Sequence, residues 1–282
     1  MNIFSNEDII NYYDLTKVHY RRAWDLTESM AMHYGYKNQS SDTFRDSLKN
    51  MNMAMADFAD IIEGEKVLDA GCGVGGSSIY LTKSLNCQVI GISLSEDQIS
   101  EAKQNAEKAG SSTIRFEKGD FTHLNYNPES FDVVWALESL VHCHDKALFF
   151  SEAYRVLKPG GRIIMGEYVR NKSQYRYKEE TILKNWLNAW AIKDIDSLSH
   201  YYELAQIKGF KCTDDINIDK NIAHASWRMF YGSWFLFALS KAYKLFNPNV
   251  SRFADQHYKG LFYQYLAFRK NLWSYHLIRC QK

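Results

Sequence analysis

Residues 65–76 read EKVLDAGCGVGG and decide the fold. Val67 and Leu68 continue an apolar run into Asp69, and four glycines follow at positions 71, 73, 75 and 76. Glycine lets the backbone pass close to a ligand, and an apolar strand that opens into a glycine-rich turn before a helix is typical of a nucleotide-type cofactor site. The stretch therefore predicts a strand, a ligand-binding turn and a helix.

Strand and helix patterns alternate after this turn. The predicted strands are 67–71, 87–95, 113–120, 131–139 and 162–169, and two further candidates lie at 211–218 and 272–281. The predicted helices between them are 77–85, 95–110, with Ser95 as N-cap, and 146–161. Such alternation indicates a parallel sheet with crossover helices, so the expected fold class is α/β, with a mostly parallel seven-stranded sheet.

Three regions are expected within one structural domain. Residues 1–62 have helical spacing and are interpreted as an N-terminal helical lid, residues 63–170 as the cofactor-binding core, and residues 171–282 as the rest of the sheet with an aromatic-rich helical cap. Pure packing of the N-terminal helices onto the core is an equally good interpretation.

Composition excludes several classes of protein. The formal net charge is +1, with 34 basic and 33 acidic residues, which gives no reason to expect a nucleic-acid partner. The five cysteines have neither zinc-site spacing nor the density of a disulfide framework, so reduced thiols are expected. No secretion signal and no uncharged apolar run of roughly 18 residues is present, so we expect a cytoplasmic protein without a membrane span.

The acid at the start of the glycine turn narrows the choice of cofactor. The spacing D-x-G-x-G-x-G differs from the G-x-G-x-x-G of dinucleotide sites, and a carboxylate here would repel a pyrophosphate and attract a cation. S-adenosylmethionine (SAM) has an amino group and a sulfonium, and no phosphate. A dinucleotide oxidoreductase would need a pyrophosphate beside Asp69 and an acid near residue 93, and neither condition is met.

Four ordered motifs resemble those of the class I SAM-dependent methyltransferases: DAGCGVGGSSIYL (69–81), GISLSEDQI (91–99), KGDF (118–121) and LKPGGRI (157–163). GISLS together with WALESLVHCHDK (135–146) is similar to the branch that holds tocopherol, sterol and sugar O-methyltransferases acting on small molecules. The resemblance covers roughly residues 60 to 170. It implies a doubly wound, Rossmann-like sheet that binds SAM and releases S-adenosylhomocysteine.

The resemblance also implies the residues that bind the cofactor. Asp69, Gly71 and Gly73 would contact its methionine part, and Asp120 and Phe121 would hold the adenine. Many class I enzymes have an acid at the end of the second strand for the ribose, whereas this chain has Ser93 and Leu94 there, so a bidentate ribose clamp is in doubt. The expected set is completed by Gln98, Cys72, Gly119 and Tyr34.

Three side chains are candidates for catalysis. Glu138 and His142 follow the fourth strand, and the carboxyl ends of the strands in such a sheet face the ligand crevice. A histidine there suits proton removal near neutral pH, so His142 is the candidate general base. By the same resemblance, Glu167 at the end of the fifth strand would orient its imidazole. The alternative is that Glu138 and His142 only position the cofactor and the loop. His144 is expected to face solvent, and no metal is expected.

Aromatic residues concentrate beyond residue 185 and suggest the nature of the acceptor. The members singled out are Trp186, Trp190, Trp227, Phe230, Tyr231 and Trp234. As a set they favour a small, largely apolar or aromatic acceptor, although each alone could be core or part of a subunit interface, and a homodimer is possible. O-methylation with His142 as general base is the leading hypothesis. The alternatives are C-methylation of an isoprenoid, a sterol-like molecule or an aromatic ring, and a SAM-binding module without catalysis.

Overall fold

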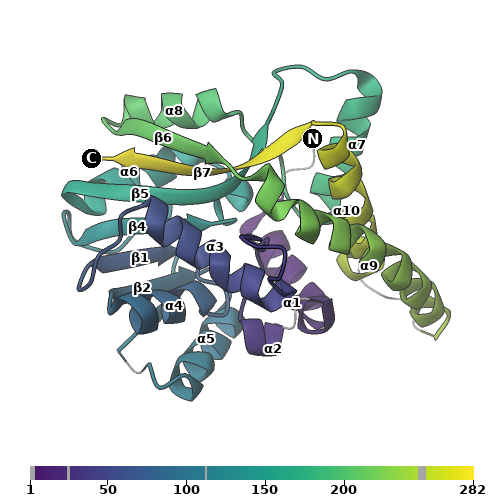
Figure 1. The fold of residues 1–282 in the computed structure, drawn as a ribbon, viewed down its shortest axis with the longest axis horizontal. Coiled ribbons are helices and arrows are strands. Elements are labelled where there is room, and N and C mark those ends of the chain that lie inside the picture. Colours follow the sequence, from purple (N-terminus) through teal and green to yellow (C-terminus); the bar gives the residue numbers. More distant parts are fainter. Residues whose placement is uncertain (1–3, 24–25, 112, 247–251) are drawn as a thin grey trace.

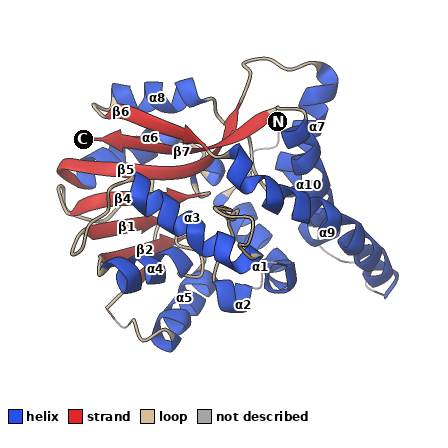
Figure 2. Ribbon diagram, viewed as in Figure 1, coloured by secondary structure: helices blue, strands red, loops and turns tan. Residues whose placement is uncertain are grey.

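A seven-stranded sheet forms the centre of the molecule (Figures 1 and 2). The computed structural model describes residues 4–23, 26–111, 113–246 and 252–282. The strands are β1 (Lys66–Ala70), β2 (Gln88–Ser93), β3 (Arg115–Lys118), β4 (Phe131–Leu137), β5 (Leu157–Arg170), β6 (Lys211–Asn217) and β7 (Trp273–Gln281). Their order is β3-β2-β1-β4-β5-β7-β6, and β7 runs antiparallel to both β5 and β6. The predicted mostly parallel α/β sheet is confirmed.

Helices cover both faces of the sheet. One face carries α3 (Phe44–Phe58), α4 (Gly76–Leu85) and α5 (Glu96–Lys108), and the other carries α6 (Lys146–Val156) and α8 (Leu198–Ile207). The alternation of side chains along β1 separates the two cores, because Val67 packs with the first group of helices and Leu68 with the second. Strands that are buried on both faces explain the unbroken apolar runs in the sequence.

The local signals place most helix ends where the sequence predicts them. Ser95 caps α5 by accepting a hydrogen bond from the backbone N–H of Gln98 at 3.2 Å. One boundary differs: α6 ends at Val156, and β5 begins at Leu157 instead of Arg162. Pro159 disfavours helical continuation, so the chain is already extended through the predicted helix end.

The remaining helices gather at one end of the sheet, and all but α2 contribute buried residues to the core that contains Val67. They are α1 (Asn6–Ala23), α2 (Leu26–Ser29), α7 (Tyr177–Ala189), α9 (Asp219–Phe246) and α10 (Arg252–Arg269). Helix α10 packs against α1, α7 and α9, and α9 extends away from the sheet in Figure 1. Among the described helices, none has the length and apolar character that crossing a membrane requires.

The cysteines differ in part from the expectation. Cys72, Cys87 and Cys143 are buried free thiols. Cys280 in β7 is disulfide-bonded, so the expectation that all five cysteines are reduced is wrong for this residue. Local spacing could not reveal this, because the pairing of β7 with its neighbours joins distant parts of the sequence.

Candidate active site

The glycine turn between β1 and α4 forms the floor of the main cavity. Gly71, Gly73 and Gly75 have φ values of 106°, 52° and 90°, which side chains rarely adopt. At Gly71 there is also no room for a side chain, since an added Cβ would lie 2.4 Å from the Cβ of Ser139. The turn therefore brings bare backbone to the cavity wall.

Asp69 is the penultimate residue of β1, beside this turn. Its Oδ2 accepts a hydrogen bond of 2.6 Å from the hydroxyl of Ser78. Burial raises the pKa of Asp69 to about 7, and the hydrogen bond from Ser78 opposes that rise by stabilising the carboxylate. A carboxylate that has lost water in this way has most to gain from a cationic ligand.

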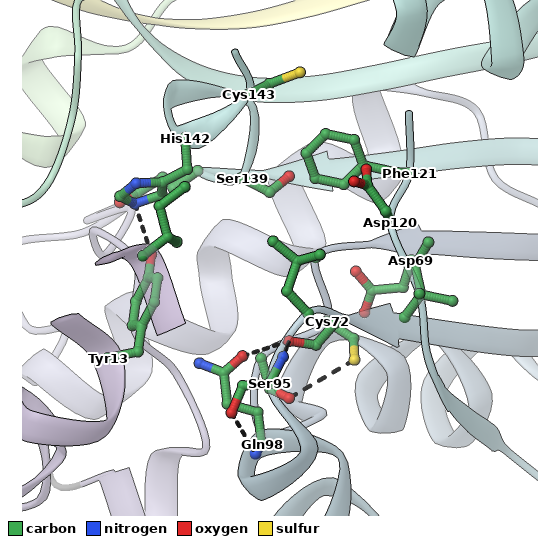
Figure 3. Close-up of a pocket in the computed structure, with 18 of the residues that line it drawn as sticks. Tyr13, Asp69, Cys72, Ser95, Gln98, Asp120, Phe121, Ser139, His142 and Cys143 are labelled. Atoms are coloured by element: carbon green, nitrogen blue, oxygen red, sulfur yellow. Dashed lines mark hydrogen bonds between the residues drawn. The ribbon is translucent and has the colours of Figure 1, made fainter. Parts of the chain in front are cut away.

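The cavity has a volume of about 320 Å³ and lies at the carboxyl ends of β1, β2 and β4. Ten of the eleven predicted cofactor residues line it: Asp69, Gly71, Cys72, Gly73, Ser93, Leu94, Gln98, Gly119, Asp120 and Phe121. Figure 3 shows Asp69, Asp120 and Phe121 on one side and Gln98 and Tyr13 on another. The topology therefore gathers segments that lie far apart in the sequence.

The side chains around the cavity are held by neighbours. Ser93 donates a hydrogen bond to Gln98 Oε1 at 2.6 Å, so these two residues form the polar end of β2. One oxygen of Asp120 accepts from both the N–H and the hydroxyl of Thr122, at 2.8 and 2.6 Å. Phe121 packs edge-on against Phe149. Hydrogen bonds and a ring contact within the protein thus hold Gln98, Asp120 and Phe121 in place.

The N-terminal segment closes the cavity, through residues that the sequence analysis missed. Asn6, Ile9, Ile10 and Tyr13 of α1 line it, followed by Met30, Met32 and His33. The i, i+3, i+4, i+7 spacing of the α1 residues marks one face of a helix and could have identified them as a group. Tyr34, which was predicted to bind the cofactor, does not line this cavity. Its N–H donates to Glu138, and its hydroxyl donates to Gln264.

His142 lies in the one-turn helix η1 (Leu140–His142) and lines the cavity. Its Nε2 is 2.9 Å from the hydroxyl of Tyr13, and its Nδ1 is 3.3 Å from the carbonyl oxygen of Ala191. A carbonyl only accepts, so Nδ1 carries the proton and Nε2 accepts from Tyr13. Burial lowers the pKa of His142 to about 4, which keeps the imidazole neutral at pH 7.

Glu138 and Glu167 have different surroundings from those expected. Glu138 has a φ of 53° and accepts hydrogen bonds from the N–H of Tyr34 and from the hydroxyls of Tyr168 and Tyr275. Burial raises the pKa of Glu138 to about 7 despite these three donors. Glu138 therefore ties the N-terminal segment to the sheet.

Glu167 does not orient the imidazole as expected. It is fully buried beneath η1, where its Oε1 accepts from the N–H of Leu140 at 2.8 Å. Burial raises the pKa of Glu167 to about 8, with Glu138 adding to the rise. The correction follows from geometry, because both ring nitrogens of His142 already have other partners.

A second, smaller cavity of about 40 Å³ adjoins the first. The two share Tyr13, Met32, His33, Glu138 and His142. The other described residues that line the second cavity are Tyr12, Tyr34, Val141, Tyr168, Trp190, Ile192, Met229, Leu236, His257 and Leu261. The shared residues form a common wall, and a ligand in one cavity would lie next to a ligand in the other at this wall, near His142.

The aromatic residues predicted to cap the acceptor divide into three groups. Trp190 lines the second cavity, and Trp186 is buried next to it. Phe230 packs on α10. Trp227, Tyr231 and Trp234 are exposed, so the expectation of a common acceptor pocket is wrong for them. Within the described residues no group of three or more His, Cys, Asp and Glu side chains could hold a metal ion.

Known proteins with similar sequences identify the family of this chain. A family model described as a methyltransferase domain matches residues 61–227. Among curated proteins, the 27-O-demethylrifamycin SV methyltransferase of Amycolatopsis mediterranei (strain S699) is 37% identical over 139 residues, which are 49% of this chain and 51% of that protein. The sterol 24-C-methyltransferase of Candida albicans (strain SC5314 / ATCC MYA-2876) is 32% identical over 171 residues, which are 60% of this chain and 44% of that protein. The chain thus matches about half the length of these relatives.

Solved structures share the fold across nearly the whole chain. The [4+2]-cyclase SpnF has a TM-score of 0.80 at 21% identity, covering 99% of this chain and 96% of that one. A geranyl diphosphate methyltransferase in complex with SAM has a TM-score of 0.69 at 16% identity, covering 89% and 98%. At these identities the likeness concerns the fold alone. The family match extends over more than half of the chain, and the protein therefore belongs to the methyltransferase domain family.

Proposed function

We propose that the protein transfers the methyl group of SAM to a small acceptor with a largely apolar or aromatic body, and that a hydroxyl oxygen receives it. One observation carries the proposal: the cavity that holds Asp69, the glycine turn, Asp120 and Phe121 shares the wall of His142 and Tyr13 with the second cavity. The names of the curated relatives and the SAM complex of a structural neighbour support the same cofactor and reaction class.

The lining residues fit SAM better than a nucleotide phosphate. Asp69 offers a desolvated carboxylate to a cationic group, and the backbone of Gly71 lines the cavity without a side chain. Asp120 and Phe121 offer a hydrogen-bond acceptor and a ring to an adenine. Of the described residues that line the cavity, none is lysine or arginine, so no cationic side chain is available there to offset the charge of a phosphate. When bound, SAM supplies an electrophilic methyl group.

The chain contributes a proton acceptor at the boundary of the two cavities. Nε2 of His142 is unprotonated and can take the proton of an acceptor hydroxyl as the oxygen attacks. The carbonyl of Ala191 holds the Nδ1 proton and stabilises the imidazolium that results. Apolar and aromatic side chains around this point exclude water, which would compete with the acceptor.

C-methylation of an isoprenoid or related alkene is a second candidate, favoured by the lining of the second cavity. The rings of Tyr12, Tyr34, Tyr168 and Trp190 surround it, and Glu138 adds a carboxyl. Aromatic faces and a carboxylate stabilise a cation, and methyl addition to an alkene produces one on carbon. The proton lost afterwards could pass to Glu138.

The two candidates are separated by where the methyl group arrives. Pure protein is incubated with SAM carrying a ¹³C-labelled methyl group and a panel of phenols, sugars, sterols and prenyl diphosphates. Release of S-adenosylhomocysteine reports turnover, and the ¹³C chemical shift of the product distinguishes a methyl on oxygen from one on carbon. Tight SAM binding without turnover across the panel would support a binding module instead. A cytoplasmic location and a homodimer stay predictions of the sequence.

A further inference from the structure

One face of α9 carries a row of exposed aromatic rings, which we call the α9 stripe: Trp227, Tyr231, Trp234 and Phe235. Their side chains are 54%, 56%, 61% and 67% exposed. The i, i+4, i+7, i+8 spacing places them on one face of the helix, and the rings of Trp227 and Tyr231 contact each other with centroids 4.5 Å apart. Contiguous exposed aromatic surface of this kind marks an interaction site.

The opposite face of α9 borders the second cavity. Met229 and Leu236 line that cavity, and Ser226 and Ser233 on the same side are buried. With about 100° between successive residues, Met229 lies roughly 200° around the helix from Trp227. Ring contacts to α10, at 5.4 Å from Phe230 to Phe262, fix this orientation. The stripe therefore faces outward because the other face is occupied.

Charges around the stripe have one sign. Lys220, Arg228 and Lys241 are exposed on α9. Helical geometry places Lys220 on the same face as the stripe, at its N-terminal end, and places Arg228 and Lys241 at the two edges of that face. The helix contains one acid, Asp219, at its first residue, and that carboxylate accepts a hydrogen bond from the N–H of Tyr275. The surface thus combines aromatic rings with cations and offers no carboxylate along the stripe itself.

We propose that the α9 stripe docks onto an anionic phospholipid surface, with α9 lying in the plane of the headgroups. Tryptophan and tyrosine are favoured at the boundary between headgroups and acyl chains, and lysine and arginine attract phosphate-bearing lipids. A symmetric contact between two copies of the chain would bring the cations of both stripes together without any acid between them. This inference does not depend on the methyl transfer proposed above.

Flotation of the full chain with lipid vesicles tests the docking. One set of vesicles contains phosphatidylcholine alone, and in the other part of it is replaced by phosphatidylserine. The unmodified protein should bind the phosphatidylserine vesicles more tightly, and added salt should weaken this binding. Lys220→Gln and Lys241→Gln should each lower the affinity for these vesicles about fivefold.

The aromatic rings are tested by the double variant Trp227→Gln/Trp234→Gln, which should lose about tenfold or more on both kinds of vesicle. The matched control is Ile62→Gln/Ile207→Gln, which removes apolar side chains that are 65% and 68% exposed on other parts of the surface. The control should bind as the unmodified protein does. Circular dichroism should show the same helix content and thermal midpoint in every variant, since all these side chains are exposed.

Three outcomes would overturn the proposal. The first is an unmodified protein that floats with neither kind of vesicle. The second is a double aromatic variant that floats as well as the control. The third is a result of light scattering in which the unmodified protein is a dimer and the double aromatic variant is a monomer. The stripe would then join two copies of the chain.

Discussion

The carboxyl group of Asp69, which lines the cofactor cavity, should gain or lose its proton near neutral pH. Burial raises the pKa of this carboxyl to about 7, although the hydroxyl of Ser78, at 2.6 Å, stabilises its ionised form. A cationic ligand is attracted by the carboxylate and not by the neutral acid. At pH 5, two units below that pKa, about 1% of the carboxyl is ionised. SAM affinity should therefore fall about tenfold, or about 1.4 kcal/mol, for each pH unit below 7.

Isothermal titration calorimetry of SAM binding measures this dependence directly. Binding below pH 7 should release one proton, which repeated titrations in two buffers of different ionisation enthalpy would count. Asp69→Asn should bind weakly and lose the pH dependence. Ser78→Ala should move the midpoint to higher pH, because the carboxylate loses a hydrogen bond. Glu138→Gln is the control, since its carboxyl has a similarly raised pKa but is engaged by Tyr34, Tyr168 and Tyr275.

Two results would refute the reasoning. SAM affinity that stays constant between pH 5 and pH 8 would show that the charge of Asp69 does not matter for binding. An Asp69→Asn variant that keeps the pH dependence, while Glu138→Gln loses it, would transfer the titration to Glu138. Either result would remove the argument that a desolvated carboxylate selects a cationic cofactor.

Four further predictions concern the cavity walls and one buried acid. Gly71→Ala should abolish SAM binding in calorimetry, because the added methyl group has no room, whereas Gly110→Ala, with φ of 68° and open space around it, should retain it. His142→Ala should lower kcat on a hydroxyl acceptor by about 10² to 10⁴ with near-normal SAM affinity, and unchanged turnover would exclude it as base. Tyr13→Phe should not lower kcat, since it only uncovers Nε2, and a loss as large as that of His142→Ala would make Tyr13 a proton relay. Burial raises the pKa of Glu167 to about 8, so the folded protein binds this proton more tightly than the unfolded chain does. The contribution of Glu167 to the free energy of unfolding therefore falls as pH rises from 4.5 to about 8. Glu167→Gln should reduce the slope of the urea unfolding free energy against pH in this window by up to about 1.4 kcal/mol per pH unit.

The sheet could be predicted because its signals are local. Apolar runs, glycine turns and caps such as Ser95 each act within a few residues, and right-handed crossovers then leave few topologies. The cofactor cavity follows from the same logic, since the carboxyl ends of parallel strands meet at one edge. For this reason the sequence predicts that residues at the ends of β1, β2 and β4 lie close together, and these residues line one cavity.

The wall of His142 could not be predicted in the same way. Tyr13 lies 129 residues from His142, and Ala191 lies 49 residues from it, so no local pattern relates them. Glu138 is separated from Tyr34 by 104 residues, and its left-handed φ turns it toward the N-terminal segment. The exposure of Trp227 could not be predicted for another reason: α9 has large apolar residues on both its covered and its exposed face, and which face is covered depends on the packing of other helices, α10 among them.

The hydrogen bond between Tyr13 and His142 connects helix α1, which lines the cavity, to the proposed proton acceptor. The same face of α1 that supplies Asn6, Ile9 and Ile10 to the cavity wall places the Tyr13 hydroxyl on Nε2. A hydroxyl acceptor can use that nitrogen only after Tyr13 has given it up, so the proposed O-methylation with His142 as base requires α1 or the Tyr13 side chain to move. Methylation of an alkene carbon makes no such demand on Nε2, because its proposed proton acceptor is Glu138, which lines both cavities. We therefore expect access to Nε2 of His142 to separate the two proposed reactions, because only O-methylation uses this nitrogen.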